Sequence, residues 1–179
     1  NESVFCDICH TITGKSGEPP VNFNYVLSPG PVKYGPREGV VSPHHETKYS
    51  GFVRTTEFCG TCHNEKNPFG LYVKSTQLEW KEGPYSGQGV RCQDCHMWRA
   101  PGKSADMGQP LEDMANHNFP GAHVPSKVRG AIELKLYADA DELEPGEKVV
   151  VSLHLYNAKA GHKIPTGSVE DRQLWAEVH

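Results

Sequence analysis

The stretch that decides the fold is "GVRCQDCHMW", residues 89–98, in which Cys92 and Cys95 stand three positions apart and His96 follows directly. The same Cys-x-x-Cys-His pattern occurs at residues 6–10 ("CDICH") and at residues 59–63 ("CGTCH"). At the Cys and His content of this chain, about 0.01 copies are expected by chance. The three copies use all six cysteines. The cysteines therefore serve one repeated purpose.

Cys-x-x-Cys-His is the attachment pattern of c-type haem, in which two thiols bond to the porphyrin and the histidine binds iron. The short spacing presents both sulfurs and the imidazole to one edge and one face of a single ring. The sequence therefore predicts three covalent haem c groups. The expected thioether sites are Cys6, Cys9, Cys59, Cys62, Cys92 and Cys95, and the expected proximal iron ligands are His10, His63 and His96.

Three other uses of the cysteines remain open. Three disulfides in an exported domain would not need a histidine after each pair. A zinc site made from two pairs would leave the third pair unmatched, and it would not need the adjacent histidine either. A thioredoxin-type redox pair belongs to a βαβ pattern that this chain lacks. Haem attachment is favoured because it alone uses every histidine of the repeat.

The composition indicates a chain with little apolar material for a core of its own. Hydrophobic residues make up 36% of 179 residues, and the mean hydropathy is −0.59. We expect the haems to form the core of the first two-thirds, which should not fold without them. The net charge is −4, and the sequence has no basic stripe of the kind that binds nucleic acid. No apolar run has membrane-spanning length. No signal peptide is recognised, so a mature or trimmed form is expected.

We expect an α+β fold with little regular secondary structure, built in two parts. Residues 1–127 should form a trihaem region of short helices and long loops, cored by the haems. Residues 128–179 should form a small C-terminal β-sandwich-like module that contributes a loop with a candidate haem ligand. The first part depends on cofactor for its packing, whereas the second shows strand alternation of its own.

Local patterns place the elements of both parts. Helices are expected at residues 75–83, where Thr76 and Glu79 have capping-box spacing, and at residues 110–119. Residues 17–39, rich in Pro and Gly, should form a long loop over a haem. Strands are expected at residues 131–140, 148–157 and 173–179. Three strands rarely stand alone, so the last one should present an open edge.

Each iron also needs a second axial ligand or an open site. Seven histidines remain for three irons, which favours bis-His, low-spin ligation. His45 is favoured over its neighbour His44 in the loop before the second motif. His162 lies between two expected strands, in a loop framed by Gly161 and Pro165. The candidate distal ligands are His44, His45, His117, His123 and His162.

Several stretches between residues 57 and 175 resemble the large multihaem c-type cytochromes, including relatives of the tetrahaem partner of hydroxylamine oxidoreductase. They are "EFCGTCHNEKNPFG", "EWKEGPYSGQGVRCQDCHM", "NHNFPGAH" and "AGHKIPTGSVEDRQLW". The resemblance implies haem c, bis-His ligation, multi-electron transport and a periplasmic or extracellular location. It also implies a haem-facing His162 beside a β module. The chain departs from the family in having three motifs, where four or more are usual.

Two functions follow as hypotheses. The first is electron transfer through three haems, with other redox proteins or haem subunits as partners. Some relatives polymerise into extracellular filaments, so a homo-polymer formed by haem stacking and the open β edge is one form of this hypothesis. The alternative is a multihaem oxidoreductase with one open catalytic haem for a nitrogen or sulfur oxyanion. Three regular motifs and abundant histidines favour electron transfer. Arg91 and Arg99 flank the third motif and are either partners of haem propionates or plain surface charges.

Overall fold

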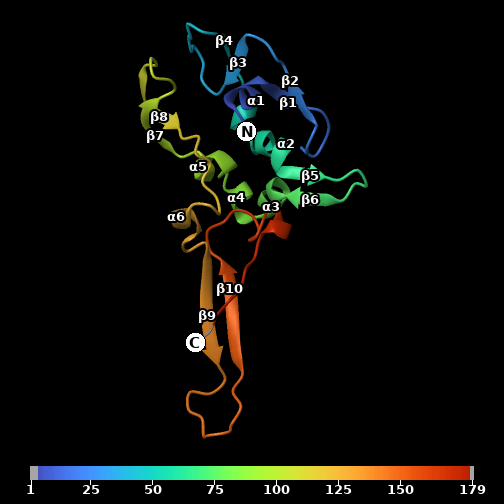
Figure 1. Ribbon diagram of the computed structural model, residues 1–179, viewed down its shortest axis with the longest axis vertical. Helices are drawn as coiled ribbons and strands as arrows, with labels where there is room; N and C mark the ends of the chain where they lie inside the picture. The colour runs from blue at the N-terminus through green and yellow to red at the C-terminus, as the bar shows by residue number, and fades with distance from the viewer. Residues whose placement is uncertain (1–3, 178–179) are drawn as a thin grey trace.

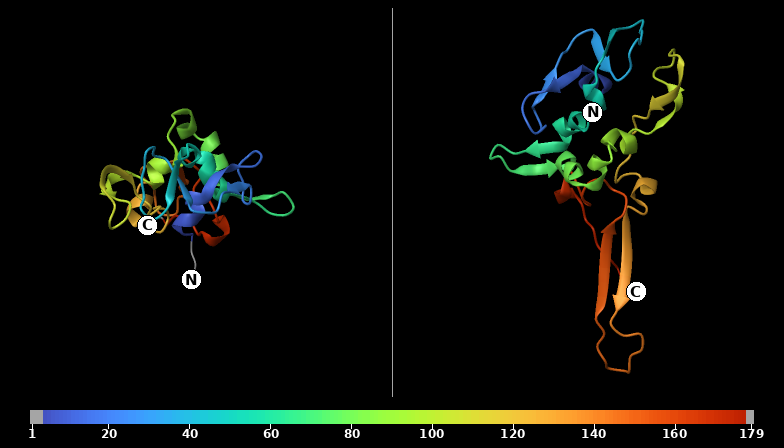
Figure 2. Two further views of the ribbon diagram at one scale, coloured as in Figure 1. Left: turned by 90° about the horizontal axis from the view of Figure 1, so that it is seen from above. Right: turned by 180° about the vertical axis from the view of Figure 1, so that it is seen from behind.

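The structure is a computed structural model that describes residues 4–177, and the molecule is elongated (Figure 1). Short helices and small sheets occupy one part, and a single long hairpin projects from its lower end. The right view of Figure 2 shows that the hairpin stands apart from the rest, while the segment after it returns to the short helices. The candidate ligands therefore have to be sought where the short elements meet.

The helices are short. They are α1 (Cys6–Thr11), α2 (Thr56–His63), α3 (Thr76–Glu82), α4 (Pro84–Gly87), α5 (Cys92–His96) and α6 (Pro125–Val128), with 3-10 turns η1 (Phe52–Arg54) and η2 (Val169–Asp171). A bilayer-spanning helix needs about 20 apolar residues. Across residues 4–177, no helix has the length and apolar character to span a bilayer.

The strands pair two by two. The sheets are β1 (Ile12–Lys15) with β2 (Tyr25–Leu27), β3 (Val32–Gly35) with β4 (Glu46–Tyr49), β5 (Asn64–Lys66) with β6 (Tyr72–Ser75), β7 (Arg99–Lys103) with β8 (Pro110–Ala115), and β9 (Ile132–Ala138) with β10 (Val151–Asn157). The β3–β4 pair is parallel and the others are antiparallel. The expected α+β class with little regular structure is confirmed.

The protein itself supplies almost no apolar core. Within the described residues, Ile12 is the one buried hydrophobic residue, at 2% exposed. Apart from Pro20 and Pro120, the other buried side chains are polar: Thr11, Thr56, Thr61, Asn64 and Gln77. A buried polar group is stable only when it is hydrogen-bonded, so the interior of this chain depends on specific bonds rather than on apolar packing.

Asn64, fully buried directly after the second motif, illustrates that dependence. Its Nδ2 donates to the Pro20 carbonyl at 2.8 Å and to Gln77 Oε1 at 3.0 Å, and its Oδ1 accepts from the Gln77 and Leu78 amides. These bonds fix the end of α2 against the start of α3. Gly60 of α2 lies close to the same partners, because a Cβ there would stand 2.8 Å from Pro20 Cγ.

The expected helix at residues 110–119 is wrong, because its first half is strand β8. That segment pairs with β7, from Arg99↔Ala115 to Lys103↔Pro110, and the ladder outweighs the helical pattern of acidic residues. The expected loop over residues 17–39 is also interrupted, by β2 and β3. β2 hydrogen-bonds to β1, and β3 to β4, so each short strand gains a partner distant in sequence.

The expected helix at residues 75–83 is confirmed as α3, although the capping box is not formed. Its N-cap is Ser75, and the Ser75 hydroxyl donates to Glu79 Oε1 at 3.0 Å. The first two expected strands are confirmed as β9 and β10, with Leu134 opposite Leu155 and Leu136 opposite Leu153. The third is not formed. Residues 173–177 carry no regular structure, and residues 178 and 179 lie outside the described part.

Candidate functional site

Each Cys-x-x-Cys-His motif forms a short helix of its own, namely α1, α2 and α5, here called the motif helices. Residues three and four apart lie on one face of a helix. The two thiols and the imidazole of each motif therefore point to one side. In all three motif helices the histidine lies in the last turn. This arrangement lets one planar group contact all three side chains.

The six cysteines are free thiols in the structure. Cys6, Cys62 and Cys95 are exposed, and Cys9, Cys59 and Cys92 are half-buried. Each motif thus offers one thiol toward the interior and one near the surface. Both remain accessible to a reagent that approaches the side of the helix.

The half-buried thiols bring the three motifs together, with α2 in the middle. A hydrogen bond from Cys59 to Cys92, followed by burial, raises the pKa of the Cys59 thiol. The same hydrogen bond lowers the pKa of the Cys92 thiol, against the opposing effect of its burial. Burial, followed by the neighbouring thiols of Cys62 and Cys6, raises the pKa of Cys9. α2 therefore contacts the α5 motif through one cysteine and lies next to the α1 motif through the other.

Two of the motif histidines are oriented by backbone carbonyls. His10 Nδ1 lies 2.7 Å from the Tyr34 carbonyl oxygen, and His96 Nδ1 lies 2.7 Å from that of Pro120. A carbonyl can only accept, so each Nδ1 carries the proton and donates it. Nε2 is then left with a free lone pair, the form in which imidazole binds a metal.

The same two histidines each face a second histidine from a distant part of the chain. The rings of His10 and His117 are 6.3 Å apart with planes at 29°, and those of His96 and His162 are 6.3 Å apart with planes at 20°. Imidazoles bound on opposite sides of one metal ion, at about 2.0 Å per bond, have ring centres about 6 Å apart. Both pairs therefore fit the axial ligands of a haem iron.

His63 has no ring contact with another histidine in the described part of the chain. Its side chain is exposed, and partial desolvation by surrounding protein atoms lowers the pKa of its imidazole, with smaller contributions from Lys74 and His162. Desolvation also lowers the pKa of His96, so both imidazoles favour the neutral form that coordinates metal.

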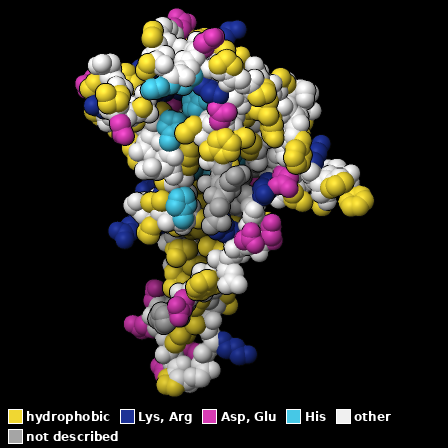
Figure 3. Space-filling model, turned by 45° about the horizontal axis from the view of Figure 1, so that its top comes forward, with side chains coloured by type: hydrophobic (Ala, Val, Ile, Leu, Met, Phe, Trp, Pro, Cys, Tyr) yellow, Lys and Arg dark blue, Asp and Glu magenta, His cyan; other side chains and the backbone are white. Residues whose placement is uncertain are grey.

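The remaining distal candidates stay predictions. His44 and His45 are exposed just before β4, where His45 Nδ1 donates to the Glu46 carbonyl at 3.0 Å. His123 is exposed before α6. Within the described part of the chain, no ring contact joins these three to a motif histidine. In the space-filling view, histidines come to the surface of the upper part beside hydrophobic side chains (Figure 3).

No protein family, curated protein or solved structure matches this chain. The geometry alone must therefore carry the interpretation. In residues 4–177, no cluster of three or more His, Cys, Asp or Glu side chains could hold a bare metal ion. A haem iron does not need such a cluster, because the porphyrin supplies four nitrogens and the protein adds one or two axial ligands.

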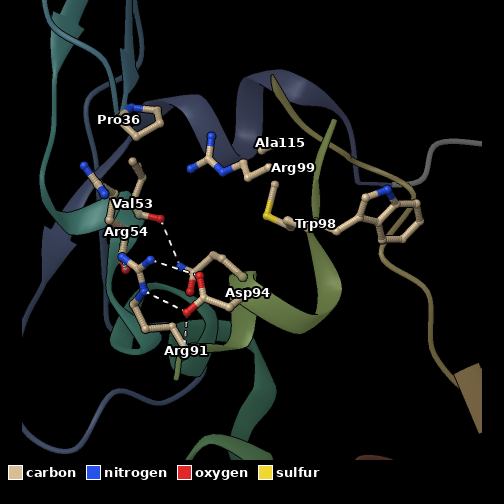
Figure 4. A pocket seen from close by; sticks show the side chains of 10 residues that line it. Pro36, Val53, Arg54, Arg91, Asp94, Trp98, Arg99 and Ala115 are labelled. Carbon is tan, nitrogen blue, oxygen red and sulfur yellow. Dashed lines mark hydrogen bonds and ion pairs between the residues drawn. The ribbon is translucent and has the colours of Figure 1, made fainter. Parts of the chain in front are cut away.

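A basic cavity of about 150 Å³ lies beside α5 and is drawn in Figure 4. Arg54, Arg91 and Arg99 line it. Arg91 forms an ion pair with Asp94 at 2.9 Å, and Arg99 donates to the Asp113 carbonyl at 3.1 Å. Both arginines that flank the third motif are thus already engaged by the protein. Their expected role at haem propionates stays a prediction.

Gln93, inside the third motif, ties α5 to the region before α2. Its Nε2 donates to the carbonyls of Val53, at 3.1 Å, and Thr55, at 2.8 Å. Its Oε1 is buried without a hydrogen-bond partner among the described residues. Nothing in the sequence indicates this contact, since the two x positions of the motif are free to vary chemically. The structure uses one of them to fix the spacing of two motifs.

Proposed function

We propose that this chain is a multihaem c-type cytochrome that carries electrons through three covalently bound haems. The thiols of the three motif helices would hold the porphyrins, and His10, His63 and His96 would bind the irons from one side. The observation that carries the proposal is the pairing of two of these histidines with His117 and His162, at ring distances suited to one shared metal ion.

The protein residues would hold the haems and orient the histidines, while the bound haem supplies reversible one-electron chemistry at iron. The Tyr34 and Pro120 carbonyls fix the Nδ1 protons of two proximal histidines and so present Nε2 to the metal. The thiol neighbours Cys59–Cys92 and Cys9–Cys62 support a close arrangement of the three groups, with the α2 motif between the other two. Short distances between redox centres favour electron hopping.

The location and partners belong to the same proposal. Covalent attachment of haem to such motifs takes place outside the cytoplasm in the cytochromes that this chain resembles, which supports a periplasmic or extracellular protein. Its partners would be other redox proteins or haem subunits. A homo-polymer through haem stacking and open β edges is the form in which the chain would conduct over longer distances.

The test is the haem content of the full chain, produced in a host that exports and attaches haem c. Mass spectrometry of the denatured protein should find three covalent haems per chain. The ferric absorption spectrum should be low-spin. Carbon monoxide added to the reduced protein should leave the spectrum of all three haems unchanged.

Two results would contradict this proposal. A chain that folds with free thiols or bound zinc and no haem would rule out the cytochrome. A high-spin band and a carbon monoxide shift in one of three haems would instead favour the oxidoreductase with an open site.

A further inference from the structure

His162 is presented by a loop rather than by a regular element. The His162 loop (residues 158–168) connects β10 to η2 and lies against α3 and α4, as the return of the chain in Figure 1 shows. Its own turn is fixed by Asn157, whose Nδ2 donates to the His162 carbonyl at 2.7 Å. That bond shapes the loop but does not place it opposite His96.

The placement comes from one carboxylate on α3. Glu79 Oε2 accepts from the Lys163 amide at 3.1 Å and from the Thr166 hydroxyl at 2.7 Å. Because that hydroxyl donates to a carboxylate, it accepts from Thr76, whose Oγ1 lies 2.9 Å away. These contacts hold the loop immediately after His162 and again four residues later. Glu79 therefore binds the loop at two points that follow His162, the backbone of Lys163 and the side chain of Thr166.

Two glycines allow the loop to approach this closely. A Cβ on Gly161 would stand 2.9 Å from Tyr85 Cδ2, and one on Gly83 would stand 3.0 Å from the Gly161 carbonyl oxygen. Real Cβ atoms are essentially never that close to other atoms. The backbone before His162 is thus packed directly on the α3–α4 junction. A side chain at either position would push the loop away.

α3 is also connected to the segment that carries His96. Trp80, next to Glu79, donates from Nε1 to the Val90 carbonyl at 2.8 Å, two residues before α5 begins. A continuous path therefore runs from the His162 loop through Glu79 and Trp80 to the third motif. Neither histidine of the pair contacts Glu79 itself.

We propose that Glu79 is the positioning residue that holds His162 opposite His96. The inference rests on the proposed function, since it assigns the group that sets the distal ligand of one haem. Without the carboxylate, the loop would lose its bonds at Lys163 and Thr166 at once. His162 would then leave the position in which its ring stacks with His96.

The experiment compares Glu79→Ala with Glu79→Gln in the haem-loaded full chain. The alanine variant should convert one of the three haems from low-spin to high-spin in the ferric EPR spectrum and open it to carbon monoxide. The glutamine variant should stay low-spin, because its carbonyl oxygen can accept from the loop while its amide donates to Ser75. Glu82→Ala, on the exposed side of the same helix, is the matched control and should match the wild type.

Added imidazole should restore the low-spin spectrum of Glu79→Ala. His162→Ala should give the same spectrum as Glu79→Ala. The variant that carries both substitutions should show no larger high-spin fraction than either one alone. If Glu79→Ala does not fold, Thr166→Val removes one of the same bonds and should raise the carbon monoxide-accessible fraction of one haem.

The outcomes separate the two proposals. Three low-spin haems in Glu79→Ala, closed to carbon monoxide, would overturn the positioning role and leave the cytochrome standing. A wild-type chain without covalent haem would overturn the cytochrome itself. A high-spin glutamine variant that matches the alanine variant would also contradict the inference, because the hydrogen-bond geometry would then not be what matters.

Discussion

The two histidine pairs share one ring spacing, 6.3 Å, but are held by different kinds of contact. His162 is anchored to α3 by Glu79, through one partly buried bond, one exposed bond and two close glycine contacts. His117 is exposed after β8, where its Nδ1 donates to the Ala115 carbonyl at 2.9 Å and Phe119 packs edge-on. One pair is therefore fixed by packing and the other by surface contacts.

An ion pair at the surface supports the His10–His117 pair. Arg37 follows β3, which supplies the Tyr34 carbonyl to His10, and it binds Asp113 of β8 at 2.6 Å. Arg37 also donates to the Asp113 carbonyl at 2.8 Å. The ion pair thus joins the strand that supports His10 to the strand that precedes His117. The comparison shows how two histidine pairs with the same ring spacing can have supports that respond differently to solvent.

The largest expected effect comes from removing a haem attachment site. Replacing Cys59 and Cys62 with alanine should remove one haem and disturb both histidine pairs, because α2 lies between the other motifs. Replacing Cys92 and Cys95 should remove one haem and leave the His10–His117 haem low-spin. Haem counting by mass spectrometry and EPR measure both effects. Equal damage from the two double variants would contradict the central place of α2.

The next effect concerns the distal histidines themselves. His162→Ala and His117→Ala should each open one haem to carbon monoxide, with the other two closed. Added imidazole should enter the His117 site more readily, because that site is exposed. Carbon monoxide difference spectra and imidazole titrations measure this. His154→Ala, on the exposed hairpin, is the control and should leave all three haems unchanged.

A smaller, shared effect is expected at Asn64, which supports neither pair alone. Asn64→Ala would leave four buried partners without their bonds and should lower the free energy of unfolding by about 3 kcal/mol. Asn67→Ala removes an amide from an exposed turn and should lower the free energy of unfolding by less than about 1 kcal/mol. Denaturant titration of the haem-loaded chain compares them. Similar losses in both variants would argue against the polar core.

The smallest effect separates the two pairs by solvent conditions. The Arg37 guanidinium lowers the pKa of Asp113, so the stabilisation is complete above the ordinary Asp pKa of about 3.9 and is lost as pH falls through the lower folded value. One molar salt should thus slightly open the His10–His117 haem to carbon monoxide and spare the other pair, and acid should open the His10–His117 haem as well. Asp113→Asn should do the same at neutral pH. In a chain that already carries His117→Ala, Asp113→Asn should cause no further rise in carbon monoxide binding.

The sequence predicted the elements that depend on local chemistry. α3, β9 and β10 follow from local periodicity and turn residues, whereas haem attachment at the three repeated motifs stays a prediction. β8 was mistaken for a helix because its acidic residues fit a first turn, whereas its pairing with β7 decides the structure. Local pattern is sufficient where the neighbours in space are also neighbours in sequence.

The pairing of the histidines could not be predicted in that way. His10 meets a residue 107 positions later, and Glu79 binds a loop more than 80 residues downstream. The Tyr34 and Pro120 contacts use backbone carbonyls. Every residue has a backbone carbonyl, so these contacts cannot be predicted from residue type. The sequence offered His117 and His162 as distal candidates, but it could not say which motif histidine each would face. The structure places His117 next to His10 and His162 next to His96, and the preference for His45 stays a prediction.

The β9–β10 hairpin has a practical consequence for work with this protein. Its seven residue pairs run without a bulge, and the strands have no other partner in the described part of the chain. Leu134, Leu136 and Leu155 are half exposed or more. Regular, unprotected edges with apolar side chains are templates for intermolecular β pairing. The hairpin, rather than the haem region, should set the concentration at which the purified chain begins to aggregate, and charged substitutions on its apolar face should raise that limit.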